Sequence, residues 1–324
     1  MRGKPSAFGF SLVVSALLLL ASGNVFAPAT RTWVSGVGDD VNPCSRTAPC
    51  KTWAGAISKT AAGGIINCLD PGGFGTVTIT KSITISCKHV EGSALSSSTT
   101  GIVINGAGID VVLRGLDIDG SPPTAPGLNG IRFAQGGSLV VEDCVIRRFN
   151  AAAPNGNGIF INHASSTARI YIVNSNITGN GAGTGGAGIQ IAPTGTGGAT
   201  VVIANSNVLN NAVGVRASTA GTTGGIGITV TDTTVAGSPS HGFVAEGPSG
   251  AVRMMLNRVV SANNSGNGVL STGANALIRI GSSVVTGNVG TGLIATGSGL
   301  LQSYGNNQVS GNTTDGTATA VALK

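Results

Sequence analysis

Residues 174–215 have the sequence NSNITGNGAGTGGAGIQIAPTGTGGATVVIANSNVLNNAVGV, in which one short pattern occurs twice. Ile177 in the first copy and Val208 in the second occupy equivalent places. Each is followed three residues later by an asparagine, Asn180 or Asn211, and then by a glycine joined to an aliphatic residue. Internal repetition with a period of about 20 to 50 residues is typical of solenoids, in which each repeat stacks on the next.

The pattern extends over most of the chain. Glycines followed by an apolar residue recur every 24 to 30 residues, at Gly130, Gly158, Gly188, Gly214, Gly242, Gly268 and Gly292. An aliphatic column keeps step with them, at Ile118, Ile146, Ile177, Val208, Val235, Val260, Val285 and Val309. Asparagines recur three residues later, at Asn180, Asn211, Asn263, Asn288 and Asn312, and a further polar column contains Asp143, Asn174, Asn205, Asp232, Asn257, Ser282 and Asn306. Stacked amides hydrogen-bond to their equivalents on adjacent strands, so both columns are predicted to form ladders.

The segments between the repeated positions are too short for helices. They carry Val and Ile at alternating positions, as in residues 199–204 and 276–280, and are interrupted by Gly and Asn. A βαβ protein needs crossover segments of about a dozen residues between parallel strands, and the repeat has no room for them. Coiling the chain pairs the strands in parallel without helices, each coil adding about 4.8 Å. The sequence therefore predicts an all-β fold, a single-stranded parallel β-helix.

One helix is predicted, before the first coil. Residues 51–62, KTWAGAISKTAA, place Trp53, Ala56 and Ile57 on one face and end before Gly63-Gly64, a helix stop signal. This helix would cover the open strand edge of the first coil. The predicted organisation is an N-terminal segment with the capping helix over residues 30–64, the β-helix over residues 65–312 and a C-terminal tail over residues 313–324.

The N-terminus has the features of a secretory signal peptide. Arg2 and Lys4 precede an apolar stretch, residues 8–21, that is too short to span a bilayer. Residues 27–29, Ala-Pro-Ala, form an acceptable cleavage site, so residues 1–29 are predicted to be removed; cleavage after Ala27 and an uncleaved membrane anchor are the alternatives. No later apolar stretch approaches membrane length, so no transmembrane segment is expected in the mature chain. The predicted location is secreted, periplasmic or on the cell surface.

The charge of the chain is small. The net charge is +6, only 9% of the residues are charged, and no basic cluster exceeds Arg147-Arg148. Nucleic-acid binding is therefore not expected.

Five cysteines in an exported chain favour disulfides. Cys44 and Cys50 close a short loop, and Cys68 and Cys87 occupy equivalent strand positions in consecutive coils. Neighbouring strands lie about 4.8 Å apart, within the Cα separations of about 4.4 to 6.8 Å that disulfides need. The predicted disulfides are Cys44–Cys50 and Cys68–Cys87. Cys144 is left over and is predicted to be a buried, inert thiol, with a reactive thiol as the alternative.

A family resemblance begins before the repeats. Residues 49–87, PCKTWAGAISKTAAGGIINCLDPGGFGTVTITKSITISC, resemble the capping helix and first coils of pectin-lyase-like, right-handed parallel β-helix repeat proteins. Residues 32–44, TWVSGVGDDVNPC, are similar to the preceding segment of many exported bacterial members. With the repeats, the resemblance covers most of residues 32–312 and implies a right-handed coil. It implies no single function, because the superfamily includes lyases, hydrolases, epimerases and adhesins.

The resemblance also implies where a site would lie. Enzymes of this family act on polysaccharides, usually acidic ones, along an exterior groove beside one of the parallel sheets. If the residue after each repeated glycine faces inward, the next one faces outward. The candidate ligand-binding residues on that outward face are Arg132, Phe160, Asn162, Gln190, Arg216 and Glu246. An outward apolar row, Val244, Leu270 and Ile294, is expected to be covered by the C-terminal tail, with a contact surface as the alternative.

No catalytic residue is assigned. Galacturonan hydrolases of the family carry Asn-x-Asp, Asp-Asp and Gly-His-Gly motifs, which the repeats of this chain lack. Hydrolysis by paired carboxylates needs two acids about 5 to 9.5 Å apart, and Glu246 has no acidic neighbour on the predicted face. Lyase chemistry needs a base, for which Arg132 or Arg216 could serve, and commonly Ca2+ held by clustered acids. No such acid cluster is visible, so no cofactor or metal site is predicted, Ca2+ being the one candidate.

The densest charged region contains Arg114, Asp117, Asp119, Glu142, Asp143, Arg147 and Arg148. The repeat alignment stacks Arg114 on Glu142 and Asp119 on Arg147, so structural ion pairs are favoured over a Ca2+ or substrate site.

The leading functional hypothesis is a non-catalytic exported protein that presents a rigid surface to polysaccharides or cell-envelope glycans. The alternative is a polysaccharide lyase or glycoside hydrolase of the pectin-lyase-like superfamily with a divergent active site.

Overall fold

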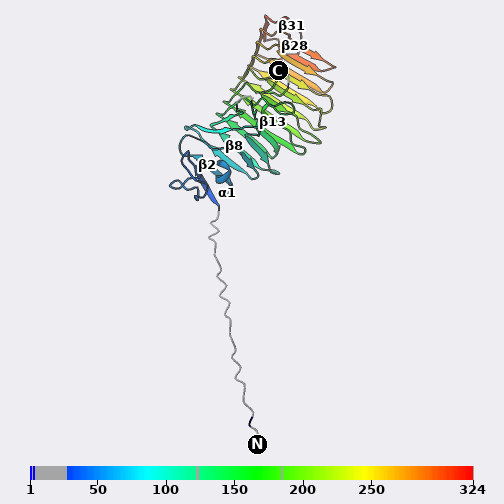
Figure 1. Cartoon of the computed structure of the whole chain (residues 1–324). Helices are drawn as coiled ribbons and strands as arrows, with labels where there is room; N and C mark the ends of the chain where they lie inside the picture. Colours follow the sequence, from blue (N-terminus) through cyan, green and yellow to red (C-terminus); the bar gives the residue numbers. More distant parts are fainter. Residues whose placement is uncertain (2, 4–27, 122–123, 184, 324) are drawn as a thin grey trace.

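The computed structural model describes residues 1, 3, 28–121, 124–183 and 185–323, which form short strands coiled around one axis (Figure 1). Of the predicted signal peptide, only residues 1, 3, 28 and 29 are among the described residues, so that prediction is not tested. The single helix found in the described part of the chain is far shorter than a membrane-crossing helix.

Three parallel sheets make up the solenoid; each complete coil contributes one strand to each sheet, and β1 and β32 add one further strand at each end of sheet A. Sheet A has twelve strands: β1 (Ala29–Val34), β2 (Thr60–Cys68), β5 (Ile83–Ser86), β8 (Asp110–Arg114), β11 (Ser138–Glu142), β14 (Thr167–Val173), β17 (Gly198–Ala204), β20 (Ile226–Thr231), β23 (Val252–Asn257), β26 (Ala276–Gly281), β29 (Leu300–Ser303) and β32 (Thr319–Ala320). Sheet B has ten: β3 (Gly72–Gly73), β6 (Gly92–Leu95), β9 (Leu116–Asp119), β12 (Val145–Arg147), β15 (Asn176–Thr178), β18 (Asn207–Leu209), β21 (Thr234–Ala236), β24 (Val260–Ala262), β27 (Val284–Thr286) and β30 (Gln308–Ser310). Sheet C also has ten: β4 (Val77–Ile79), β7 (Ile102–Asn105), β10 (Asn129–Gln135), β13 (Asn157–Ile161), β16 (Ile189–Ile191), β19 (Val215–Ser218), β22 (Phe243–Glu246), β25 (Val269–Thr272), β28 (Thr291–Thr296) and β31 (Thr314–Gly316). The predicted parallel β-helix is confirmed.

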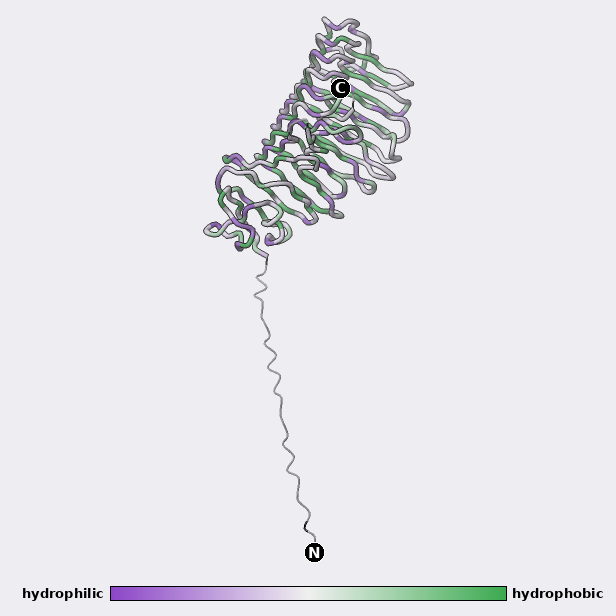
Figure 2. Tube along the Cα trace, viewed as in Figure 1, coloured by the Kyte–Doolittle hydropathy of each residue, from purple (hydrophilic) through white to green (hydrophobic). Residues whose placement is uncertain are grey.

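The interior is built from rows of aliphatic side chains that lie over one another on adjacent coils. Ile146 pairs with Ile118 on one side and with Ile177 on the other, and Ile177 pairs with Val208. All of these side chains are fully buried. Hydrophobic stretches recur from coil to coil along the whole solenoid (Figure 2). Since every inward residue faces the same neighbours one coil away, the core is continuous from the first coil to the last.

The predicted aliphatic column is wrong at Val260. Val235 pairs with Ser261 and Ser261 pairs with Val285, so the serine occupies the interior position and Val260 faces outward. Ser261 is fully buried and its hydroxyl donates to the Gly268 carbonyl oxygen at 2.8 Å. The one-residue shift keeps an asparagine in the ladder, three residues after the interior position.

The amide ladder follows this shift. Asn264, rather than the predicted Asn263, is buried and donates from Nδ2 to Asn288 Oδ1 at 2.8 Å. Asn263 instead has a φ of 54° at the turn before the ladder residue. Asparagine tolerates this left-handed conformation better than most residues. The other predicted polar column is also mainly a turn column, because most of its members have positive φ; Arg258, with φ 52°, takes the place predicted for Asn257.

The repeated glycines are explained by the ladder. A Cβ at Gly188 would lie 2.8 Å from Asn211 Nδ2, and one at Gly268 would lie 2.8 Å from Asn288 Nδ2. The ladder amides and the aliphatic side chains beside them fill the space that a side chain would need. Glycine at this point of each coil is therefore a consequence of close packing.

The N-terminal end of the solenoid is covered by helix α1 (Trp53–Lys59), which buries Trp53 and Ala56. The side chain of Thr52 accepts a hydrogen bond from the Gly55 amide and caps the helix. The helix is shorter than predicted, because Thr60 is already extended and begins β2. At the other end, β31 and β32 pair with β28 and β29, so the described part of the tail extends sheets C and A.

Both predicted disulfides are present, Cys44–Cys50 with a Cα separation of 4.6 Å and Cys68–Cys87 with one of 4.7 Å. Cys144 is a free, buried cysteine, and burial raises the pKa of its thiol to about 12. The thiol is therefore protonated at neutral pH, and its burial agrees with the prediction.

Candidate functional site

The outward face of sheet C brings most of the candidate residues into one row. Arg132 pairs in register with Phe160, Phe160 with Gln190, and Gln190 with Arg216. Their neighbours Ile131, Ile159, Ile189 and Val215 are fully buried, so alternation turns the candidate side chains away from the core. Consecutive side chains in the row are one strand spacing, about 4.8 Å, apart.

Three of these residues form the floor of a hollow of about 320 Å³: Phe160, Gln190 and Arg216. Its walls are loops that precede and follow the strands, and they include Pro154, Pro193 and Thr194. Within the described residues the Gln190 amide makes no hydrogen bond to another side chain or to the backbone, so it is free to bind a ligand. The loop residues were missed by the sequence analysis, because loops do not keep the repeat.

Arg132 and Asn162 lie beside the hollow. Arg132 Nε donates to Asn162 Oδ1 at 3.3 Å, and the Arg132 side chain is exposed. No carboxylate among the described residues lies within ion-pair distance of Arg132. The pair would contact only a ligand long enough to extend past Phe160.

Glu246, the sixth candidate, forms an ion pair with Arg216. Arg216 Nε donates to Glu246 Oε1 at 3.1 Å and Nη2 donates to Oε2 at 2.9 Å. The two residues come from adjacent strands, β19 and β22. The charge of the hollow floor is therefore compensated within the protein.

His241 lies two residues before β22, and its Nδ1 accepts a hydrogen bond from the Asn267 backbone amide at 2.9 Å. Burial lowers the pKa of His241, and the positive charge of Arg216 lowers it further against the opposing effect of Glu246. The imidazole is therefore neutral at pH 7 and adds no second cation to this region.

Two members of the outward apolar row, Val244 and Leu270, are covered by residues other than the C-terminal tail. Val244 is buried against Ala187 and Val213, and Leu270 packs against the same group. The covering residues precede β16 and β19, so they belong to neighbouring coils. The expectation that the tail covers this row is wrong for Val244 and Leu270, because the described tail residues form strands β31 and β32 instead.

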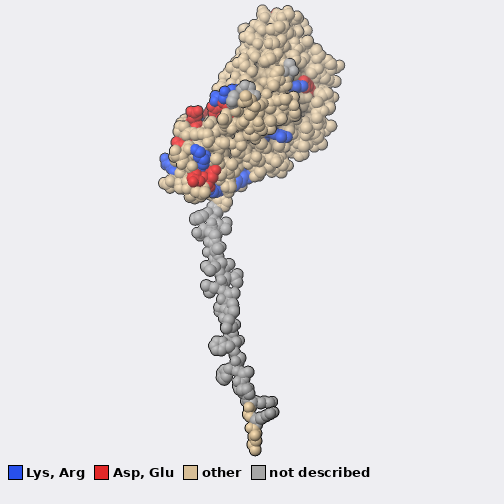
Figure 3. All heavy atoms as spheres, in the orientation of Figure 1, with Lys and Arg blue, Asp and Glu red and all other residues tan. Residues whose placement is uncertain are grey.

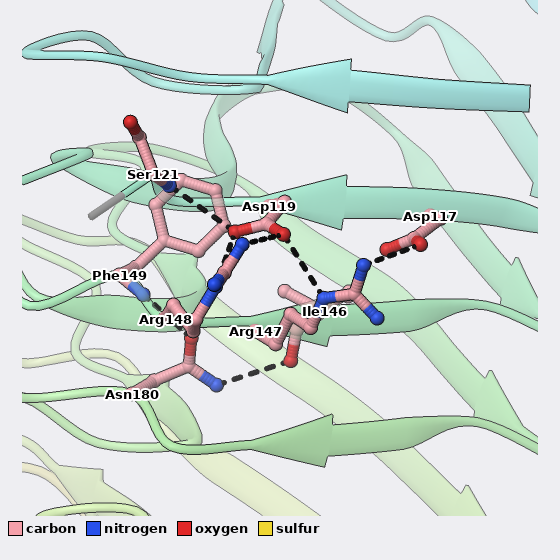
Figure 4. A network of polar contacts seen from close by, with 8 residues as sticks. All are labelled: Asp117, Asp119, Ser121, Ile146, Arg147, Arg148, Phe149 and Asn180. Atoms are coloured by element: carbon pink, nitrogen blue, oxygen red, sulfur yellow. Dashed lines mark hydrogen bonds and ion pairs between the residues drawn. The ribbon is translucent and has the colours of Figure 1, made fainter. Parts of the chain in front are cut away.

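The dense charged region is an ion-pair network (Figure 4). Arg114 Nε donates to Glu142 Oε2 at 2.6 Å, and Arg147 Nε donates to Asp119 Oδ2 at 3.0 Å, which confirms both predicted pairs. Arg148 also binds Asp119. Burial acts to raise the pKa of Asp119, but hydrogen bonds from Arg148 and Arg147 outweigh it and leave that pKa lowered. These charges compensate one another and leave little to bind a ligand.

Charged atoms gather over the N-terminal coils in Figure 3, whereas the C-terminal coils on that face are mostly neutral. Among the described residues no three His, Cys, Asp or Glu side chains come together as metal ligands would. His163 is a core residue whose Nε2–H donates to the Gly198 carbonyl oxygen at 2.7 Å.

A second hollow, of about 370 Å³, lies on the outer face of sheet A over β17, β20, β23 and β26. Val202, Met255 and Leu277 give it an apolar lining. The described residues that line it include no aromatic ring and no side-chain amide, which makes the sheet C hollow the better candidate for a sugar ligand.

Neither the family models nor the curated proteins contain a match to this sequence. Among solved structures, the crystal structure of pectate lyase Pel9A is similar, with a TM-score of 0.55 and 16% sequence identity over 89% of this chain and 80% of that one. The chain has the pectin-lyase-like fold. At 16% identity this likeness establishes only the fold, a right-handed parallel β-helix. Because one fold supports many activities, the activity of this chain has to be inferred from its site.

Proposed function

We propose that this chain is an exported, non-catalytic protein that binds polysaccharide along the outer face of sheet C. The observation that carries the proposal is the row of Phe160, Gln190 and Arg216 on the floor of one hollow. The spacing between strands is close to the length of one sugar unit in an extended chain, so successive units would meet successive coils.

The side chains suit a sugar. Phe160 offers a partly exposed ring on which the apolar face of a pyranose can stack, and Gln190 offers both a donor and an acceptor for hydroxyl groups. The hollow is a rigid site, because its floor belongs to three hydrogen-bonded strands. Rigid, preorganised sites lose little entropy on binding.

The non-catalytic assignment rests on the lack of free carboxylates among the described residues at the hollow. None of the described residues that line the hollow is Asp or Glu, and the carboxylate of Glu246 is held by Arg216. Two free carboxylates are what glycoside hydrolysis needs. Export is supported by the N-terminal sequence and by two disulfides, which persist in oxidising compartments.

Lyase activity is the second candidate, favoured by the fold likeness to pectate lyase Pel9A. Affinity gel electrophoresis of the purified protein against a panel of soluble polysaccharides tests binding, and ultraviolet absorbance of unsaturated products tests lyase activity on the same panel. We expect retardation by at least one polymer without product. Turnover of any polymer would refute the non-catalytic assignment.

Phe160→Ala should weaken retardation about tenfold, since stacking on an aromatic ring is lost. Tyr171→Ala is the matched control, because Tyr171 is an exposed aromatic residue on the outer face of sheet A. Equal effects of the two substitutions would mean that the sheet C hollow is not the binding site.

A further inference from the structure

The charge of the sheet C hollow is set by one ion pair. Arg216 is the only charged residue among the described residues that line the hollow. It makes two hydrogen bonds to Glu246, 3.1 Å long from Nε and 2.9 Å long from Nη2, and each uses a different carboxylate oxygen. This two-point geometry is the one with which arginine binds carboxylates most strongly.

A uronate unit would compete with Glu246 for the same guanidinium. A sugar carboxylate would either displace Glu246 from Arg216 or bind the remaining N–H donors close to the like charge of Glu246, so its attraction to Arg216 is offset in both cases. The side chains of Arg216 and Glu246 are 36% and 23% exposed, so solvent screens the ion pair only in part. If a sugar displaced Glu246, its carboxylate would need water or another cation as a new partner. His241 is neutral and Arg132 lies outside the hollow, so neither supplies a replacement cation at the floor.

A neutral sugar meets no such competition. Arginine has five N–H donors, and Glu246 occupies the edge that carries Nε and Nη2. The remaining donors of Arg216, together with the amide of Gln190 and the hydroxyl of Thr194, can bind sugar hydroxyls while the ion pair stays intact.

We propose that Glu246 is a specificity-determining residue that neutralises Arg216, so that the hollow takes neutral, hydroxyl-rich polysaccharides in preference to polyuronates. This inference rests on the proposed function and names its ligand class. Glu246 acts by holding Arg216 and is therefore a positioning residue. A substitution that keeps the shape of the Glu246 side chain but removes its charge tests this role.

The test compares Glu246→Gln with the wild-type protein by affinity electrophoresis, on polygalacturonate and alginate as acidic polymers and on hydroxyethylcellulose and galactomannan as neutral ones. The wild-type protein should be retarded more by a neutral polymer than by either acidic one. Glu246→Gln frees the guanidinium and should raise affinity for the acidic polymers about tenfold, which moves the preference of the variant from the neutral toward the acidic polymers. Continued retardation by the neutral polymer reports that the variant hollow is still formed.

Asp232→Asn is the matched control. Asp232 holds Arg258 in the same two-point manner, with both contacts at 2.7 Å, at the turn between sheets A and B and away from sheet C. Its substitution changes the net charge by the same amount and frees one arginine, so it should leave acidic-polymer affinity within about twofold. Equal gains in Asp232→Asn and Glu246→Gln would reduce the effect to net charge and overturn the inference.

The outcomes separate the two proposals. Wild-type protein that prefers polygalacturonate or alginate to the neutral polymers overturns the specificity inference and leaves polysaccharide binding in place. Retardation of no variant by any polymer removes the proposed function itself. The wild-type preference decides the first question even if Glu246→Gln does not fold.

Discussion

Replacing Asn211 with alanine should destabilise the solenoid by about 3 kcal/mol. The Asn211 side chain is fully buried and makes three hydrogen bonds. Its Oδ1 accepts from the backbone amide and from Nδ2 of Asn180, at 3.0 and 2.9 Å, and its Nδ2 donates to the Ile177 carbonyl oxygen at 2.8 Å. Each bond contributes about 1 kcal/mol, and each loss strands a buried polar group on the neighbouring coil.

Asn207→Ala is the control within the same coil. The Asn207 side chain is exposed and donates to Asn176 Oδ1 at 2.9 Å, its one side-chain hydrogen bond within the described residues, so its loss should cost less than about 0.5 kcal/mol. Urea unfolding gives the two free energies. Native-state hydrogen exchange of strands β15 and β18 shows whether the damage is confined to adjacent coils, as expected when repeats contact only their neighbours. Equal destabilisation by the two substitutions would refute the ladder as a source of stability.

Three further predictions test packing, pH dependence and reactivity. Gly188→Ala should destabilise by about 1 to 3 kcal/mol in urea unfolding, because its Cβ would lie 2.6 Å from Val208 Cγ1, whereas Gly227→Ala, with nothing within 4 Å, should be neutral; equal costs would contradict the packing argument. Asp119→Asn should lower the free energy of unfolding above about pH 5. The folded protein lowers the pKa of Asp119 below 3.8, so the stability that its charge contributes is lost as pH falls below 3.8, and the difference from wild type should shrink in that range. A pH-independent difference would contradict this. Cys144 should not react with iodoacetamide at pH 8 until the protein unfolds, and labelling of the native protein, followed by mass spectrometry, would show that the thiol is accessible.

The sequence was sufficient to predict the coiled architecture and the residues of its interior, because most coils place an aliphatic side chain at the same interior position. Ile146, Ile177 and Val208 were assigned to one row from spacing alone, and they do lie on adjacent strands. The error at Val260 has the same origin. An aliphatic residue was assumed to fill the interior position, whereas the chain places Ser261 there and keeps Asn264 in the ladder.

The candidate site could be predicted only in part, because its walls are loops. Phe160, Gln190 and Arg216 were found because they lie on strands, where alternation decides the face. Pro154 and Thr194 were not, since loop length varies from coil to coil and no register transfers from one loop to the next. Finding them from sequence would require knowing how each loop folds back over the sheet.

The charge of the site depends on contacts that run diagonally between strands. Arg216 pairs in register with Val244, and Glu246 with Ser218, so a row-by-row comparison leaves both charges without a partner. Residues two positions apart on adjacent strands are within reach when the side chains are long, and the Arg216–Glu246 pair spans that diagonal. Arg147 reaches Asp117 in the same way, at 2.7 Å. A solenoid face on which no two opposite charges are in register can therefore still be neutral, because charges two positions apart on adjacent strands form ion pairs. The ligand class of such a face should be inferred from both the in-register and the diagonal neighbours of each charged residue.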